Sequence, residues 1–201
     1  MIRNLIFDFG GVLIDWNPRY LYASYFQSKE EMELFLRRVG FDQWNAKFDG
    51  GYPLNQGVTE LCRKFPEYDE PICLFRDEWE KTVKGPMHGM SGLLDRLTAN
   101  GYKLYGLTNW SNETFPIARR KYPLFEWLDG IVVSGAEKIC KPDPRIYHIL
   151  LDRYQLSAAE TLFIDDTQAN IDAARKIGFS VIHFSGYDAL LKELERFQIK
   201  L

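Results

Sequence analysis

The most regular feature of the chain is a series of short, nearly continuous runs of hydrophobic residues. Five of them are rich in β-branched and aromatic residues: Asn4–Asp8, Tyr102–Thr108, Gly130–Ser134, Leu162–Asp165 and Ser180–Phe184. Continuous rather than alternating hydrophobic positions are typical of strands buried on both faces of a parallel sheet. We therefore expect five parallel strands.

Between the later runs, hydrophobic residues recur at the spacing of a helix. Leu93, Leu94 and Leu97 share one face, and Gly101 follows as a helix-terminating residue. Three further helices are expected on the same grounds. One begins at Asp143-Pro144 and reaches about Tyr154, one has Ile171, Ala174 and Ile177 on one face and ends at Gly178, and the last has the amphipathic positions Leu190, Leu191, Leu194 and Phe197. Strands that alternate with helices through short links predict an α/β fold with a doubly wound, Rossmann-like parallel sheet.

The interval from about Trp16 to Pro86 breaks this alternation, because it contains no convincing strand. A capping box begins at Ser28, and further helical patterns cover about Thr59–Phe65 and Ile72–Val83. Roughly 70 residues of mostly helical chain are too many for a loop. We predict a core made of residues 1–15 and 87–201, with residues 16–86 inserted as a helical domain.

Composition and charge narrow the class of protein. The 201 residues are 46% hydrophobic and 26% charged, which indicates a folded globular protein. A net charge of −3 lacks the basic excess of a nucleic-acid-binding surface, and no run approaches the roughly 18 apolar residues of a membrane span. Asp8 and Asp15 interrupt the apolar N-terminus, so we expect no signal peptide. The three cysteines lack C-x-x-C spacing, which indicates reduced thiols in a cytoplasmic protein without a zinc site. None of these patterns predicts the oligomeric state.

Reactive side chains stand where the predicted strands end. The first strand ends at Asp8, the second at Thr108-Asn109 and the fourth at Asp165-Asp166, while Lys141 lies in the loop after the third. Each alone has an ordinary explanation as a cap or turn residue. Together they supply a nucleophile, a hydroxyl, a cation and an acidic pair at the carboxyl ends of parallel strands, where open α/β sheets bind ligands.

Four segments resemble, in order, the four motifs of the haloacid dehalogenase-like (HAD) hydrolase superfamily: FDFGGVLID, LYGLTNWS, KICKPDPRIY and TLFIDDTQANIDAARKIG. The resemblance covers about Met1–Asp15 and Met87–Phe184. The inserted helices resemble the C1-type cap of this superfamily, which closes over the active site. Within the superfamily, the chain most resembles phosphatases of small sugar phosphates, such as α-glucose-1-phosphate phosphatases.

The resemblance implies a Mg²⁺-dependent phosphatase that acts on a small phosphorylated metabolite, with no nucleic acid or membrane as partner. Asp8 would attack phosphorus and form an aspartyl-phosphate. Asp8, Asp166 and the backbone carbonyl of Gly10 would hold the magnesium ion, since oxygen ligands suit it.

The resemblance also assigns the groups around the phosphoryl group. Thr108 and Lys141 would be catalytic and bind the substrate together with Asn109. Asp165 would bind the metal through water or orient it, and Asn170 would orient the loop. Such a site works by positioning and electrostatics, as phosphoryl transfer generally requires.

Gly10 departs from the usual pattern. Most phosphatases of this superfamily have a second Asp two residues after the nucleophile, and it serves as general acid and base, a role worth roughly 10²–10⁴-fold in rate. Three explanations are possible: Asp15 or a cap residue supplies the proton, the substrate has a leaving group that needs little protonation, or the protein binds a phosphorylated ligand without turnover. The resemblance favours the second, because related sugar-1-phosphate phosphatases share the Gly. Gly10 and Gly11 also have a purely structural explanation, a tight turn with positive φ.

Two other functions use a similar set of residues. A 2-haloacid dehalogenase displaces halide with the same Asp and needs no metal, but it has uncharged residues in place of Asp165-Asp166 and tends to have an aromatic residue in place of Gly10. A receiver domain also combines a phosphorylated Asp with a Thr and a Lys, but its acidic pair lies on the first strand. The acidic pair on a late strand favours the phosphatase.

Overall fold

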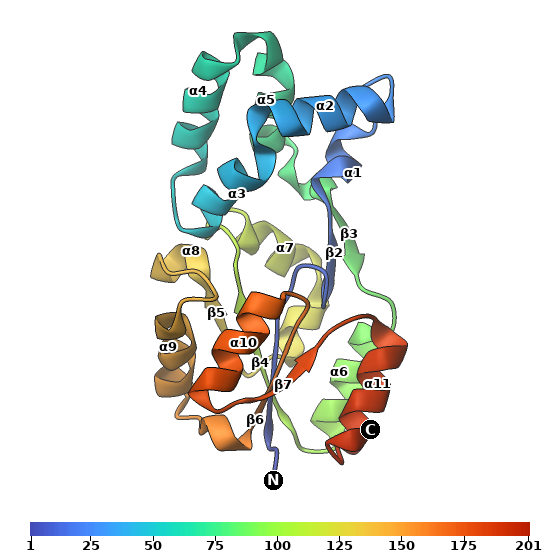
Figure 1. The fold of residues 1–201 in the computed structure, drawn as a ribbon. Coiled ribbons are helices and arrows are strands. Elements are labelled where there is room, and N and C mark those ends of the chain that lie inside the picture. Colours follow the sequence, from blue (N-terminus) through green and yellow to red (C-terminus); the bar gives the residue numbers. More distant parts are fainter.

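The five hydrophobic runs form one parallel sheet. The computed structural model, which describes residues 1–201, contains strands β1 (Asn4–Phe7), β4 (Lys103–Thr108), β5 (Gly130–Val133), β6 (Thr161–Asp165) and β7 (Ser180–His183). Their order across the sheet is β5-β4-β1-β6-β7, and every neighbouring pair is parallel (Figure 1). The predicted Rossmann-like α/β fold class is confirmed.

Helices cover both faces of the sheet. Helices α6 (Met90–Ala99) and α11 (Tyr187–Arg196) pack on one face, and α9 (Pro144–Tyr154) and α10 (Gln168–Ile177) pack on the other. Side chains alternate between these layers: Leu5 and Phe7 of β1 point to the α6 and α11 side, whereas Ile6 points to the α9 and α10 side. Because helices bury the side chains on both faces of the sheet, successive residues of each strand are hydrophobic, and the runs are continuous. None of the helices has the length and apolar character needed to cross a membrane.

The register of the three central strands sets the position of the polar residues. Phe7 of β1 pairs with Gly106 of β4 on one side and with Ile164 of β6 on the other. One residue further along, Asp8 is therefore level with Asp165. The carboxyl ends of these strands meet at one edge of the sheet, on the side that faces the inserted helices (Figure 1).

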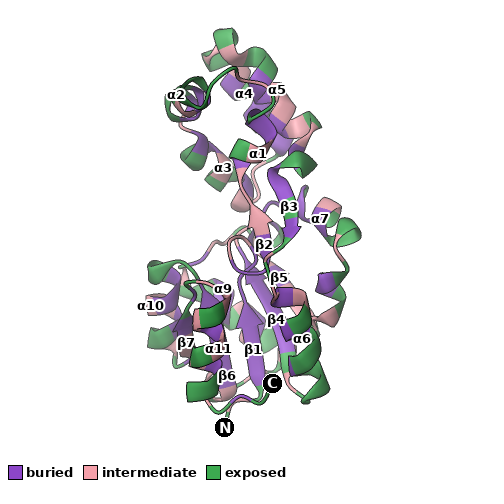
Figure 2. Cartoon of the chain, turned by 90° about the vertical axis from the view of Figure 1, so that its right-hand side faces the viewer, coloured by how far each residue is buried: buried purple, intermediate pink, exposed green.

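The inserted segment is helical and hangs on a two-stranded ribbon. Its helices are α1 (Pro18–Tyr22), α2 (Lys29–Val39), α3 (Phe41–Asp49), α4 (Leu54–Lys64) and α5 (Asp69–Asp77). The ribbon pairs β2 (Ile14–Trp16) with β3 (Val83–Pro86) in antiparallel orientation, and it links the two groups of helices in Figure 2.

This ribbon corrects the expectation that no strand lies between Trp16 and Pro86 and that a helix reaches Val83. Helix α5 ends at Asp77, and a short 3₁₀ turn over Trp79–Thr82 follows. Strand β3 contains Gly85 and Pro86, residues that weaken strand propensity, so its sequence carries little β signal. The strand forms because it pairs with β2, which lies far away in the sequence, so the local pattern of residues does not predict it.

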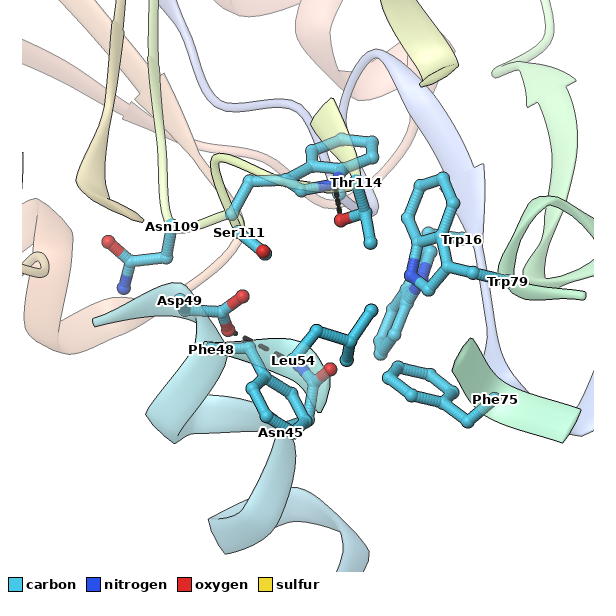
Figure 3. Close-up of a pocket in the computed structure, with 12 residues that line it drawn as sticks. Trp16, Asn45, Phe48, Asp49, Leu54, Phe75, Trp79, Asn109, Ser111 and Thr114 are labelled. Atoms are coloured by element: carbon cyan, nitrogen blue, oxygen red, sulfur yellow. Dashed lines mark hydrogen bonds between the residues drawn. The ribbon is translucent and has the colours of Figure 1, made fainter. Parts of the chain in front are cut away.

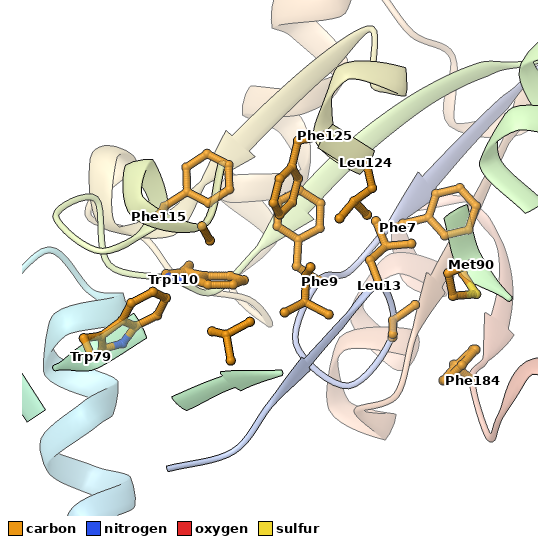
Figure 4. Close-up of a cluster of buried hydrophobic side chains, with 14 of the residues drawn as sticks. Phe7, Phe9, Leu13, Trp79, Met90, Trp110, Phe115, Leu124, Phe125 and Phe184 are labelled. Atoms are coloured by element: carbon orange, nitrogen blue, oxygen red, sulfur yellow. The ribbon is translucent and has the colours of Figure 1, made fainter. Parts of the chain in front are cut away.

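One apolar cluster runs from the sheet into the inserted helices. It contains 39 buried residues, and Figure 4 shows the part that crosses between the two regions. Phe9 contacts Trp110 at a ring-centroid distance of 6.3 Å, and Trp110 contacts Trp79 below the inserted helices at 5.7 Å. The inserted helices are thus packed onto the sheet region through aromatic side chains.

Gly106 of β4 provides a test of this packing. A Cβ at Gly106 would lie 2.3 Å from Cζ of Phe9, so Gly106→Ala must displace the ring that follows Asp8. We expect a loss of about 1–3 kcal/mol in the free energy of unfolding, measured by urea denaturation. Gly92→Ala is the matched control, because a Cβ there meets nothing within 4 Å and Ala favours the helix by up to about 1 kcal/mol. Equal effects of the two substitutions would contradict the packing argument.

Candidate active site

Asp8 is a buried carboxylate at the end of β1. Its side chain accepts hydrogen bonds from the backbone N–H of Phe9 at 2.7 Å and from Nζ of Lys141 at 2.9 Å, both at Oδ1. Burial raises the pKa of Asp8 to about 6, although the charge of Lys141 opposes the rise. Its second oxygen has no hydrogen-bond partner, so it is free to meet a ligand.

Lys141 is held between two carboxylates and is itself buried. Its Nζ donates to Asp165 Oδ2 at 2.7 Å and to the carbonyl oxygen of Leu107 at 2.7 Å. Burial alone would lower the pKa of Lys141, but Asp8 and Asp165 raise it, so the lysine stays charged. Asn109 fixes the lysine backbone: Nδ2 of Asn109 donates to the Lys141 carbonyl at 2.9 Å, and Lys141 N–H donates to Oδ1 at 2.8 Å.

The two carboxylates of the acidic pair differ in their hydrogen bonding: that of Asp165 has several donors, and that of Asp166 has almost none. Asp165 is fully buried, and its oxygens accept hydrogen bonds from Lys141, from Asn170 Nδ2 at 3.0 and 3.1 Å and from Thr167 N–H at 2.8 Å. Asp166 is exposed and accepts only a 3.3 Å contact from the Thr167 hydroxyl. Although the residue as a whole is exposed, neighbouring groups partly desolvate its carboxylate, and this desolvation, together with the charge of Asp165, raises the pKa of Asp166.

These residues fit a divalent cation. Asp8, Asp165 and Asp166 each place an oxygen within 4.8 Å of the others, which concentrates negative charge. The backbone carbonyl oxygen of Gly10, two residues after Asp8, accepts no hydrogen bond and is therefore free to meet a ligand. Oxygen donors of this kind suit Mg²⁺. Because hydrogen bonds already occupy Asp165, the oxygen atoms still available to a cation are on Asp8, Asp166 and Gly10; the resemblance to the HAD motifs implies the same three residues.

Thr108 carries a buried hydroxyl without a partner. Its side chain is 1% exposed, and Oγ1 has no hydrogen bond. Such orphaned groups are rare in folded proteins, because leaving one unpaired costs about 1–3 kcal/mol. An oxygen of a bound substrate would satisfy it.

Gly10 and Gly11, the two glycines that follow Asp8, differ in backbone conformation. Gly11 has φ of +77°, and a Cβ there would lie 2.5 Å from Oδ2 of Asp166. Gly10 has no positive φ, and a Cβ there meets nothing within 4 Å. The expectation that both residues need positive φ is therefore wrong for Gly10, and only Gly11 is required by the turn.

A cavity of about 80 Å³ lies between Gly10 and the inserted helices (Figure 3). Six of its lining residues are apolar: Trp16, Phe48, Leu54, Phe75, Trp79 and Trp110. The others are polar and come from α3 and from the segment after β4: Asn45, Asp49, Asn109, Ser111 and Thr114, beside Gly10. The cavity therefore offers a mainly aromatic wall with a few polar groups near the sheet edge.

Three polar residues of the cavity wall, Asp49, Asn45 and Ser111, are not predicted by any motif in the sequence. The only local signal for Asp49 is its place before Gly50-Gly51, which reads equally well as a helix end. Asn109, expected to bind substrate, borders the cavity, but its amide is occupied by the backbone of Lys141.

A parallel sheet that gathers a buried Asp, a buried Lys and an acidic pair at one edge is the arrangement of a haloacid dehalogenase-like hydrolase. Residues 2–178 match the family model described as "Hydrolase: haloacid dehalogenase-like hydrolase". The chain belongs to this family, and the resemblance seen in its motifs is confirmed.

Known relatives include two kinds of hydrolase. The sesquiterpene phosphatase astK of Aspergillus oryzae is 28% identical over 95% of this chain and 94% of its own length. (S)-2-haloacid dehalogenase 1 of a Pseudomonas species is 33% identical over 92% of this chain and 85% of its own length. Among solved structures, the HAD family enzyme BT-2542 of Bacteroides thetaiotaomicron, in complex with magnesium and inorganic phosphate, superposes with a TM-score of 0.69 at 21% identity, covering 92% of this chain and 96% of that one.

Proposed function

We propose that this protein is a Mg²⁺-dependent phosphatase that hydrolyses a small phosphorylated metabolite through an aspartyl-phosphate on Asp8. The cluster of Asp8, Asp165 and Asp166 carries the proposal. Displacement of halide from carbon needs no cation, whereas three carboxylates within 4.8 Å need one to offset their repulsion, and Lys141 supplies only a single charge.

Each residue has a separate task in this reaction. Asp8 attacks phosphorus with its free oxygen, while Lys141 stabilises the negative charge that develops on the phosphoryl group. The Thr108 hydroxyl donates to a phosphoryl oxygen. Asn109 and Asp165 act indirectly, because they fix the backbone and the ammonium group of Lys141. Magnesium, held by Asp8, Asp166 and the Gly10 carbonyl, would neutralise phosphate charge.

The relatives of this chain include both a phosphatase and a haloacid dehalogenase. The sesquiterpene phosphatase matches nearly the whole chain, and the structural neighbour BT-2542 is a complex with magnesium and inorganic phosphate. The (S)-2-haloacid dehalogenase matches almost as much of the chain, so haloacid hydrolysis is the alternative.

Magnesium dependence separates the two functions. We expect hydrolysis of aryl phosphates that is lost in excess chelator, and no hydrolysis of 2-haloacids. Asp166→Asn should raise the magnesium concentration for half-maximal activity at least 10-fold, because it removes one of the two charged ligands. Asp172→Asn, on the exposed side of α10, is the control and should leave that concentration unchanged. Full activity in chelator, or turnover of a haloacid, would refute the proposal.

Residues 16–86 form the proposed cap. The side chains that line the cavity beneath it indicate which chemical groups the substrate carries. Aromatic and aliphatic side chains line the cavity, and such walls bind apolar or flat groups. We therefore propose that the organic part of the substrate is apolar or aromatic rather than a bare sugar.

A matched substrate series tests this preference. Phenyl-substituted alkyl phosphates should have a kcat/KM at least 10-fold above that of glucose 6-phosphate. The reason is that the phenyl group buries apolar surface against the aromatic side chains that line the cavity, whereas the sugar does not. Trp79→Ala should reduce the advantage by removing part of the wall. A higher kcat/KM for the sugar phosphate would instead favour the sugar-phosphate phosphatases that the motifs resemble.

A further inference from the structure

Gly10 leaves a phosphate ester without the proton donor that would stand two residues after the nucleophile. A Cβ at this position meets nothing within 4 Å, and Gly10 itself borders the cavity below α3. The space that a carboxylate would fill at Gly10 is therefore open toward the inserted helices. A proton donor from those helices has room to reach the same place.

Asp49 is the only titratable side chain among the residues that line this cavity. Its carboxylate points from the end of α3 into the cavity, on the side of Asn109 and Ser111 (Figure 3). Asn45 Nδ2 donates to Oδ2 of Asp49 at 3.2 Å, and Oδ1 has no hydrogen bond. One carboxylate oxygen is thus oriented and the other is free.

Contacts with the sheet region hold this end of α3 in place. The Ser134 hydroxyl donates to the carbonyl oxygen of Asp49 at 2.5 Å. Gly51 lies so close to Gly135 that a Cβ at Gly51 would be 2.5 Å from the Gly135 carbonyl oxygen. The position of Asp49 over the sheet edge is therefore built into the fold.

We propose that Asp49 is the general acid and base of the hydrolysis and takes the role of the side chain absent at Gly10; this inference rests on the proposed phosphatase function. As an oxygen of Asp8 bonds to phosphorus, the bond from phosphorus to the leaving oxygen breaks and Asp49 gives that oxygen its proton, so that an alcohol departs. Water then attacks phosphorus, Asp49 takes the proton of the water, and inorganic phosphate and free Asp8 result.

The electrostatic setting of Asp49 agrees with this role. Burial raises the pKa of Asp49 to about 7, and the negative charge of Asp8 contributes to the rise. A donor near neutral pH needs such a value. Asp15, the other candidate, accepts a hydrogen bond from the Tyr20 hydroxyl at 2.8 Å and does not line the cavity.

The leaving group decides whether a proton donor matters. We compare 4-nitrophenyl phosphate, whose leaving group departs as a stable anion, with 4-nitrobenzyl phosphate, whose alkoxide needs a proton. Asp49→Asn should lower kcat/KM for the benzyl ester by roughly 10²–10⁴-fold and for the phenyl ester by far less. Asp42→Asn, an exposed acid on the same helix, is the control and should change neither value.

A second variant guards against a merely structural effect. Gly10→Asp, placed in the Asp49→Asn protein, should restore hydrolysis of the benzyl ester, because the open space at Gly10 accepts the carboxylate. Melting temperatures confirm that each variant is folded.

Two results would overturn the role of Asp49 alone: an equal loss on both esters, or no loss on the benzyl ester, while the unmodified enzyme hydrolyses both. If the unmodified enzyme hydrolyses neither ester at any magnesium concentration, the proposed function itself fails and this inference fails with it.

Discussion

Replacing Asp8 with Asn should reduce phosphatase turnover by about 10⁴-fold or more, because the amide cannot form the aspartyl-phosphate. The fold should persist, since the Asn side-chain oxygen still accepts the hydrogen bond from Phe9 N–H. Steady-state kinetics with an aryl phosphate measures the loss. Rapid acid quench with labelled substrate should place phosphorus on Asp8 in the unmodified protein and not in the variant.

Asp15→Asn is the control for this substitution. Asp15 lies seven residues further along the same segment, but its carboxylate accepts a hydrogen bond from the Tyr20 hydroxyl outside the cavity. Its replacement should leave turnover within a few-fold of the original. Substantial turnover by Asp8→Asn would remove the nucleophile from the mechanism and the proposed function with it.

Replacing Lys141 with Met should lower the free energy of unfolding by about 3–5 kcal/mol at neutral pH, because it leaves two buried carboxylates without their shared cation. The Met side chain has a similar length, so the main change is the loss of charge. Chemical denaturation in the absence of divalent ions measures the effect. Added magnesium should recover part of the stability by binding the folded protein.

Lys103→Met shows how much of this effect comes from burial. Lys103 lies 2.7 Å from Asp129, the same distance as Lys141 from Asp165, but its side chain is 63% exposed compared with 1% for Lys141. Loss of the exposed pair should cost no more than about 1 kcal/mol. Similar losses in the two variants would mean that the buried pairs contribute little to stability.

The sheet and its polar edge were predictable because their signals are local. Strands buried on both faces require continuous hydrophobic runs, and parallel strands place their carboxyl ends at one edge. Asp8, Thr108 and Asp165 could therefore be placed together from their positions at strand ends alone. The assignment of separate tasks within the acidic pair needed coordinates, because only the hydrogen bonds of Asp165 distinguish it from Asp166.

The contribution of the inserted helices could not be predicted in the same way. Asp49 reaches the cavity because α3 ends against Ser134, the residue that directly follows β5 and begins α8 (Ser134–Glu137), and this contact joins residues 85 positions apart in the chain. Nothing in the residues around Asp49 indicates this contact. The ribbon of β2 and β3 escaped prediction for a related reason, since each strand is short and is stabilised mainly by its pairing with the other.

The ribbon has a consequence for how such a protein can diversify. Asp15 and Gly85 are paired across it, so the inserted chain leaves and re-enters the sheet region at neighbouring points. The pairing of β2 with β3 already holds the two ends of the inserted chain together, and the entropic cost of closing them depends only weakly on how long the inserted chain is. Replacement of the chain between β2 and β3 would therefore exchange one inserted domain for another, while Asp8 and the acidic pair keep their positions at the edge of the sheet.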